Sequence, residues 1–164
     1  MELDVVQGDI TEQRVDAIVN AANERMRGGG GVDGAIHAAA GPGLLDECVE
    51  RFPHGLATGE AGWTHAHQLP ARFVIHVVGP IHGRGDRSQL VSCYANAVAV
   101  ADEIGAASVA FPLVSAGVYG WPLDDAVAAA VDTLREASTS VREARIVAFG
   151  GSTYDAVSAY LRDH

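Results

Sequence analysis

One stretch organises the interpretation of this chain: Asn20-Ala-Ala-Asn23-Glu-Arg-Met-Arg-Gly28-Gly-Gly-Gly31-Val-Asp33-Gly34. An apolar segment at residues 17–21, typical of the end of a buried strand, leads into it, and a helix-like run follows it at residues 35–40. A strand, a glycine loop and a helix start together point main-chain N–H groups at an anion. Glycines alone are equally typical of a flexible surface loop, but the two asparagines and Asp33 favour a binding site carried on the loop.

The size and composition of the chain predict one folded domain over residues 1–164. Its hydrophobic content of 48% is sufficient for a substantial core and argues against disorder. The start of the chain has neither the basic region nor the apolar core of a signal peptide, and no apolar run is long enough to cross a bilayer. We therefore expect a cytoplasmic protein with no membrane partner.

The charge of the chain limits its partners. The net charge is −10, the sequence pI is about 4.9, and all eleven basic residues are arginines. Binding of a nucleic-acid polymer through its backbone is therefore not expected. A phosphate ligand must be held mostly by main-chain amides and helix N-termini, and the absence of lysine excludes a lysine nucleophile or Schiff base.

The cysteines and histidines do not indicate a metal or disulfide framework. Cys48 and Cys93 lie far apart in sequence, so reduced thiols are expected. His65 and His67 alternate as strand residues do, but no cysteine or carboxylate stands near them in the sequence. We expect no metal and no other cofactor.

Apolar periodicity and turn residues predict alternating strands and helices. Thr11 is expected to cap a short helix, Ser88 to cap a long one, and Pro122 to occupy a first helical position. Strands are predicted at residues 3–7, 17–20, 60–67, 72–78, 108–113 and 145–149, and the longer helices at residues 33–40, 42–51, 88–104, 122–137 and 153–162. This order predicts an α/β sheet covered on both faces, with the two glycine-bearing loops at the carboxyl ends of strands, where ligands bind.

Motifs along nearly the whole chain, from about Leu3 to Tyr160, resemble the macro domain family. The loop quoted above continues into Ile36-His37-Ala-Ala-Ala-Gly41. The other matching segments are Gly8-Asp9-Ile10-Thr11, Thr58-Gly59-Glu60-Ala61, Val74-Ile75-His76-Val77-Val78-Gly79-Pro80 and Phe111-Pro112-Leu-Val-Ser115-Ala-Gly117-Val-Tyr119-Gly120-Trp-Pro122. The chain looks most like the MacroD-type ADP-ribosyl hydrolases.

This resemblance implies a three-layer α/β/α fold with a mixed, roughly six-stranded central sheet. It also implies an enzyme that removes mono-ADP-ribose from protein Asp and Glu esters and deacetylates O-acetyl-ADP-ribose. The expected partners are ADP-ribose and mono-ADP-ribosylated proteins, and the expected oligomeric state is a monomer. A non-catalytic ADP-ribose reader and, more weakly, hydrolysis of ADP-ribose on nucleic acid remain open alternatives.

The adenine end is expected to use Asp9, Ile10 and Phe149. A carboxylate only accepts hydrogen bonds, which suits an exocyclic amine, although Asp9 could instead cap a helix. By resemblance, Asp9 accepts from the adenine amino group and the Ile10 amide lies nearby. Phe149 ends the last predicted strand, where a lone Phe is often part of the core, but the resemblance places it near adenine.

The catalytic end is expected to use Asn23 and Asp33. Either Asn20 or Asn23 could merely form a turn. An amide side chain both donates and accepts, however, and by resemblance Asn23 orients the distal ribose, while Asn20 is a further candidate for substrate binding. Asp33 either caps the helix that begins there or, beside a bound diphosphate, orients or partly deprotonates a water. His37 and His76 are interpreted as structural.

The two loops are expected to hold the diphosphate through their main chains. In the second loop Ser115 adds a hydroxyl donor, and Ala116 stands where the family usually has threonine, so we expect altered affinity without loss of binding. Tyr119 is aromatic at a position where, by resemblance, a ring packs beside the distal ribose. The loop residues predicted to bind substrate are Gly29, Gly30, Gly31, Val32, Ser115, Ala116, Gly117, Val118 and Tyr119.

Overall fold

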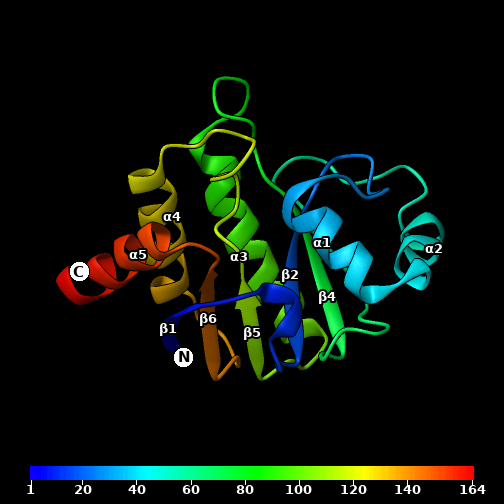
Figure 1. Cartoon of the computed structure of the whole chain (residues 1–164), viewed down its shortest axis with the longest axis horizontal. Helices are drawn as coiled ribbons and strands as arrows, with labels where there is room; N and C mark the ends of the chain where they lie inside the picture. The colour runs from blue at the N-terminus through cyan, green and yellow to red at the C-terminus, as the bar shows by residue number, and fades with distance from the viewer.

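The computed structural model describes all residues from 1 to 164 and is built on one six-stranded sheet (Figure 1). The strand order is β1-β6-β5-β2-β4-β3. All neighbours are parallel except the edge pair β3 and β4, which is antiparallel. The strands are β1 (Glu2–Gln7), β2 (Ala17–Ala22), β3 (Ala61–His65), β4 (Phe73–Val78), β5 (Ser108–Phe111) and β6 (Glu143–Ala148).

Helices cover both faces of the sheet, which confirms the predicted three-layer α/β/α fold with a mixed six-stranded sheet. One face packs against α1 (Gly31–Ala40) and α2 (Pro42–Arg51), with the short 3₁₀ helix η1 (Ile10–Glu12) beside α1. The other face packs against α3 (Arg87–Glu103), α4 (Leu123–Glu136) and α5 (Gly151–Asp163). The chain contains no helix that could span a membrane.

Alternation of side chains along the central strands separates two hydrophobic cores. In β2, Ala17 and Val19 belong to the larger core under α3, α4 and α5, whereas Ile18 belongs to the smaller core under α1 and α2. In β4, Val74 likewise faces the smaller core. Side chains two residues apart in a strand point to the same face of the sheet. Asn20, two residues after Ile18, and His76, two residues after Val74, therefore face α1 and α2 as well. They are register partners in the sheet.

The loops after β2, β4 and β5 gather at the carboxyl-terminal edge of the sheet, above the strands in Figure 1. Parallel strands all end at the same edge of a sheet, and the chain returns to the opposite edge through a crossover helix before the next strand begins. The two glycine-bearing loops predicted from the sequence therefore lie on the same edge.

Three predicted helix starts were wrong in detail. Asp9, rather than Thr11, caps η1, and it accepts hydrogen bonds from Thr11 N at 2.8 Å and Thr11 Oγ1 at 2.7 Å. Asp86, rather than Ser88, caps α3, where it forms a capping box with Gln89. Pro122 precedes α4 as its N-cap residue and is not its first helical residue. In the first two helices a carboxylate accepts hydrogen bonds at the N-terminus, where N–H groups lack helical partners.

Candidate functional site

The glycine loop and the start of α1 present a row of unpaired main-chain amides. The N–H groups of residues 29–33, here called the first amide row, donate to no protein acceptor, and the first helical bond is Gly34 N to Gly30 O at 3.2 Å. Gly30 is the N-cap residue and makes no side-chain cap bond. A helix N-terminus with free amides favours an anion.

A second amide row lies in the loop between β5 and α4. The N–H groups of Gly117, Val118 and Tyr119 donate to no protein acceptor. The loop is closed by Trp121 N, which donates to Ser115 O at 2.9 Å, and Ser115 has a φ of +65°. Consecutive amides in such a turn form a concave anion site.

Asp33 does not cap α1, so the capping alternative for this residue is wrong. It occupies the third position of the helix and is buried, with 5% of its surface exposed. Asn20 Nδ2 donates to Asp33 Oδ1 at 2.8 Å, and His37 Nε2 lies 3.4 Å from the same oxygen. A buried carboxylate with a side-chain donor and a neighbouring imidazole is suited to holding a water or a substrate hydroxyl.

Gly29 packs between the two predicted catalytic side chains. A Cβ atom at this position would lie 3.1 Å from Asn23 Nδ2 and 3.2 Å from Asp33 Oδ2. The Gly29 carbonyl in turn packs on Gly34, where a Cβ atom would lie 2.5 Å from that oxygen. Glycine at these positions therefore lets the loop rest directly on the first turn of α1 and brings Asn23 and Asp33 together.

Hydrogen bonds between buried side chains fix the orientation of Asn20. Asn20 Nδ2 lies 3.2 Å from His76 Nδ1, and His76 Nε2 lies 3.0 Å from Thr64 Oγ1. Because an amide nitrogen only donates, His76 Nδ1 is the acceptor and the proton of the ring is on Nε2. His76 Nε2–H donates to Thr64 Oγ1, and the Thr64 hydroxyl donates to His65 O. Burial lowers the pKa of His76 to about 3, with a smaller contribution from His37, so the ring is neutral.

Asn20 lies behind Asp33 and not in the open cleft, because its side chain is completely buried. Its Oδ1 is the one buried side-chain polar atom without a hydrogen-bond partner in the protein. The predicted contact of Asn20 with substrate stays a prediction; the structure shows its contacts with Asp33 and His76.

The side chains of Asn23 and Ser115 are already engaged within the protein. Asn23 Nδ2 donates to Gly28 O at 3.1 Å, and its Oδ1 accepts from Arg25 N at 3.1 Å. Ser115 Oγ donates to Pro80 O at 2.7 Å. The hydroxyl proton that we expected to serve an anion is thus committed to Pro80, and the neighbouring main-chain amides remain as donors.

The residues expected at the adenine end lie just after β1 and β6, the edge strand and its neighbour. Asp9 follows β1 and uses Oδ1 for the η1 cap, so its second oxygen has no assigned protein donor. The Ile10 N–H donates to no protein acceptor. Phe149 follows β6 and is 87% exposed, so it is not part of the core.

Tyr119 of the second loop is influenced by the charges of two carboxylates, Asp33 and Glu24. Burial raises the pKa of Tyr119, and the charges of Asp33 and Glu24 raise it further. Neighbouring Val118 is 94% exposed and Ala116 is half-buried.

His37, which was interpreted as structural from the sequence, lies beside Asp33. The spacing of four residues between Asp33 and His37 on one helix was the available signal, because such residues are neighbours on the helix surface.

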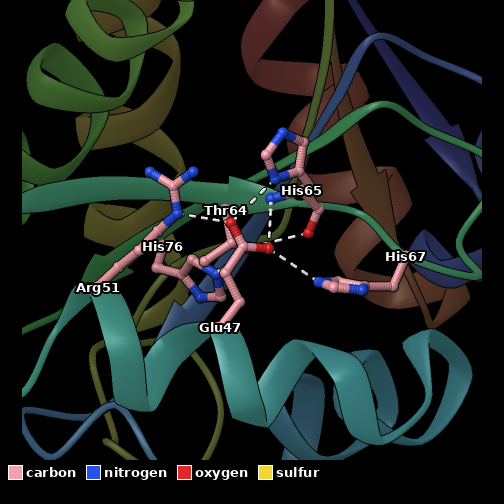
Figure 2. A network of polar contacts seen from close by, with 6 residues as sticks. All are labelled: Glu47, Arg51, Thr64, His65, His67 and His76. Atoms are coloured by element: carbon pink, nitrogen blue, oxygen red, sulfur yellow. Dashed lines mark hydrogen bonds and ion pairs between the residues drawn. The ribbon is translucent and has the colours of Figure 1, made fainter.

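The pair His65 and His67 does have a carboxylate partner, contrary to our expectation from sequence proximity. Figure 2 shows Glu47 of α2 reaching both rings, with Glu47 Oε2 3.0 Å from His65 Nδ1 and Oε1 2.8 Å from His67 Nε2. Burial raises the pKa of Glu47, but hydrogen bonds from His67, His65 and Arg51 outweigh it and hold that pKa below its usual value. No group of three or more His, Cys, Asp or Glu residues in the structure could hold a metal ion.

Comparisons of the sequence with known proteins identify a family. The family model described as Macro domain matches residues 19–130. A macro domain-containing protein of Streptomyces coelicolor is 53% identical over 163 residues, which cover 96% of this chain and 96% of the relative.

Solved structures agree as well. The Oceanobacillus iheyensis macrodomain with ADP has a TM-score of 0.94 and 40% identity, covering 98% of this chain and 90% of the other. The Trypanosoma brucei macrodomain in complex with ADP-ribose has a TM-score of 0.90 and 39% identity, covering 97% of this chain and 68% of the other. With a family model that spans most of its length and close relatives aligned over nearly all of it, this chain belongs to the macro domain family.

Proposed function

We propose that this protein binds ADP-ribose and hydrolyses the ester bond between ADP-ribose and a protein Asp or Glu side chain. The same site is proposed to deacetylate O-acetyl-ADP-ribose, because both substrates are esters of the distal ribose. Residues 1–164 are proposed to act as one domain. The relatives with ADP and with ADP-ribose support the ligand class.

The observation that carries the proposal is that the buried carboxylate of Asp33 stands at the end of the first amide row, next to Asn23. The first and second amide rows supply donors for a diphosphate without any lysine. Asp33 Oδ1 is held by Asn20, while Asp33 Oδ2 lies on the side of Gly29 and Asn23. A carboxylate fixed in this way can orient a water and accept its proton as the water attacks the ester.

In this scheme the remaining residues bind and orient the substrate. Asp9 and Ile10 recognise adenine, and the exposed ring of Phe149 packs on it. The two amide rows bend the diphosphate over the sheet edge, and Tyr119 packs beside the distal ribose. The reaction consumes one water and yields ADP-ribose and the free carboxylic acid, with no metal or redox step required.

The second candidate is a reader that binds ADP-ribose without turnover. One observation favours it: both ends of the Asn23 amide are already bonded to Gly28 and Arg25, so this side chain holds the loop shape. For hydrolysis, Asn23 must give up one of these hydrogen bonds to form one with the substrate. Otherwise Asp33 must act without help from Asn23.

Single-turnover release of ADP-ribose from a defined Glu-linked peptide separates the two functions, with calorimetry of free ADP-ribose measured beside it. The proposal predicts release and binding, with Ser-linked and Arg-linked peptides as comparison substrates for linkage preference. Binding of ADP-ribose without release from any substrate leaves the reader function.

A further inference from the structure

A cavity of about 660 Å³ adjoins the candidate site. It is formed by the loop after β2 at Asn23–Arg25, by the loop after β4 between Val78 and Gly85, and by Thr58 and Tyr119. Asn23 and Tyr119 thus belong both to this cavity and to the proposed ribose site. Thr58 Oγ1 donates to Glu24 Oε1 at 2.7 Å across the cavity wall.

The order of the strands shows which part of a substrate this cavity faces. The proposed adenine residues follow β1 and β6, the second amide row follows β5, and the first amide row follows β2. The next strand in the sheet is β4, whose end and following loop form the cavity. A ligand laid along the sheet edge from adenine to distal ribose therefore directs the group attached to that ribose toward this cavity.

Two uncommitted cations line the cavity. Arg25 and Arg84 are exposed, and neither guanidinium has an ion pair or a hydrogen bond within the protein. Nearby Arg27 differs, because it donates to main-chain carbonyls, including those of Met26 and Cys48. The charged residues that line this opening are the two free arginines and one Glu24, so cations outnumber carboxylates in its wall although the protein has a net charge of −10.

We propose that this cavity takes the acceptor side of the substrate, a polypeptide segment that carries further Asp or Glu residues next to the modified one. The proposal rests on the proposed function, since it assumes that the distal ribose lies at Asn23 and Tyr119. Free guanidiniums select carboxylates through two parallel hydrogen bonds. A nucleic-acid acceptor is disfavoured, because its backbone brings a charge with every nucleotide toward an acidic protein without lysine.

The test compares two Glu-linked mono-ADP-ribosylated peptides of equal length, one with Asp and Glu flanking the modified residue and one with Asn and Gln. Wild-type protein should show about five-fold higher kcat/KM for the acidic peptide, the scale expected for two exposed ion pairs. Arg25→Gln with Arg84→Gln should abolish this preference, and Arg25→Glu with Arg84→Glu should reverse it. The preference should also shrink as salt is raised from about 0.05 M to about 0.5 M.

Arg142→Gln is the matched control. Arg142 is exposed and without an ion pair, but it precedes β6, at the opposite end of the strands. This variant should keep the wild-type preference for the acidic peptide. Calorimetry of free ADP-ribose reports whether any variant has disturbed the ribose site itself.

The outcomes separate this proposal from the proposed function. Equal kcat/KM for both peptides overturns the acidic-acceptor assignment and leaves the hydrolase standing. If neither peptide is cleaved, fluorescence anisotropy of the same intact peptides still decides, and tighter binding of the acidic one supports the docking site. An ADP-ribosylated oligonucleotide that is processed better than the acidic peptide, with the advantage lost in the double variant, assigns the cavity to nucleic acid instead.

Discussion

Asn20 Nδ2 donates to Asp33 Oδ1 at 2.8 Å, so an amide in the sheet holds the carboxylate in the first turn of α1. The same nitrogen lies 3.2 Å from His76 Nδ1, one strand further along. Both partners are acceptors, and the Asn20 amide is the one side-chain donor that connects them. The orientation of Asp33 therefore depends on two strands of the sheet as well as on its own helix.

Replacement of Asn20 by alanine should cost both stability and turnover. It leaves buried acceptors of Asp33 and His76 without their donor, which typically costs about 1–3 kcal/mol in unfolding free energy. Turnover should fall as well, because the Asp33 carboxylate is no longer held. Urea unfolding and single-turnover release measure the two effects. Asn96→Ala, which loses one hydrogen bond to Gly59 O, should lower stability alone.

Asp33→Asn removes the charge while keeping the size and an acceptor for Asn20. Release from a Glu-linked peptide should fall about 10²-fold or more, the usual scale for loss of acid–base assistance. Affinity for ADP-ribose should change far less, because the amide rows are main-chain. The exposed Asp46→Asn variant on α2 serves as control. Unchanged release by Asp33→Asn removes this residue from the reaction.

Asp9→Asn separates adenine recognition from helix capping. An asparagine oxygen can keep the hydrogen bonds from Thr11, but the second oxygen of Asp9 becomes an NH₂ donor that opposes the adenine amine. Affinity for ADP-ribose should fall by about 1–3 kcal/mol while the melting temperature stays near that of wild type. Thr11→Val, which weakens the cap alone, should show the reverse. Calorimetry and thermal melting distinguish them.

Phe149→Ala tests the exposed ring after β6. Because Phe149 is 87% exposed, its loss should change stability by no more than about 0.5 kcal/mol. If the ring packs on adenine, ADP-ribose affinity should fall by about 1–3 kcal/mol and ribose phosphate affinity should not change. Val49→Ala, an exposed apolar residue on α2, is the control. An equal loss for both ligands would contradict stacking on the base.

His76 should make the fold sensitive to acid. Its pKa is about 3 in the folded protein against 6.5 ordinarily, so between these values the unfolded chain takes up a proton that the folded protein does not. Stability should therefore fall as pH drops through this window, with His76 contributing up to about 1.4 kcal/mol per pH unit. His76→Gln, which can still accept from Asn20 and donate to Thr64, should flatten the slope in urea unfolding between about pH 5 and pH 7. If the unfolding free energy of wild type and of His76→Gln changes equally with pH, other groups cause the acid sensitivity.

Local sequence determined the elements and the edge at which the loops meet. The apolar runs of β2 and β4, the glycines before α1 and the alternation of strands with helices are chain-local signals, and the structure confirms the three-layer fold and the mixed sheet that they and the family resemblance predicted. Free main-chain amides follow from the same signals, because a glycine loop at a helix start leaves its N–H groups unpaired.

Only the tertiary structure decided which side chains meet. Asn20, Thr64 and His76 come from three strands, and their contact depends on sheet register, which no local pattern states. The same holds for Glu47 between His65 and His67, where a helix packs across the edge strand. Substrate contacts of Asn23 and Ser115 were predicted from the chemistry of their side chains. In the structure Asn23 donates to Gly28 O, where the loop folds back on itself, and Ser115 donates to Pro80 O in a distant part of the sequence. Residue type limits what a side chain can bond, whereas three-dimensional packing determines which partner it reaches.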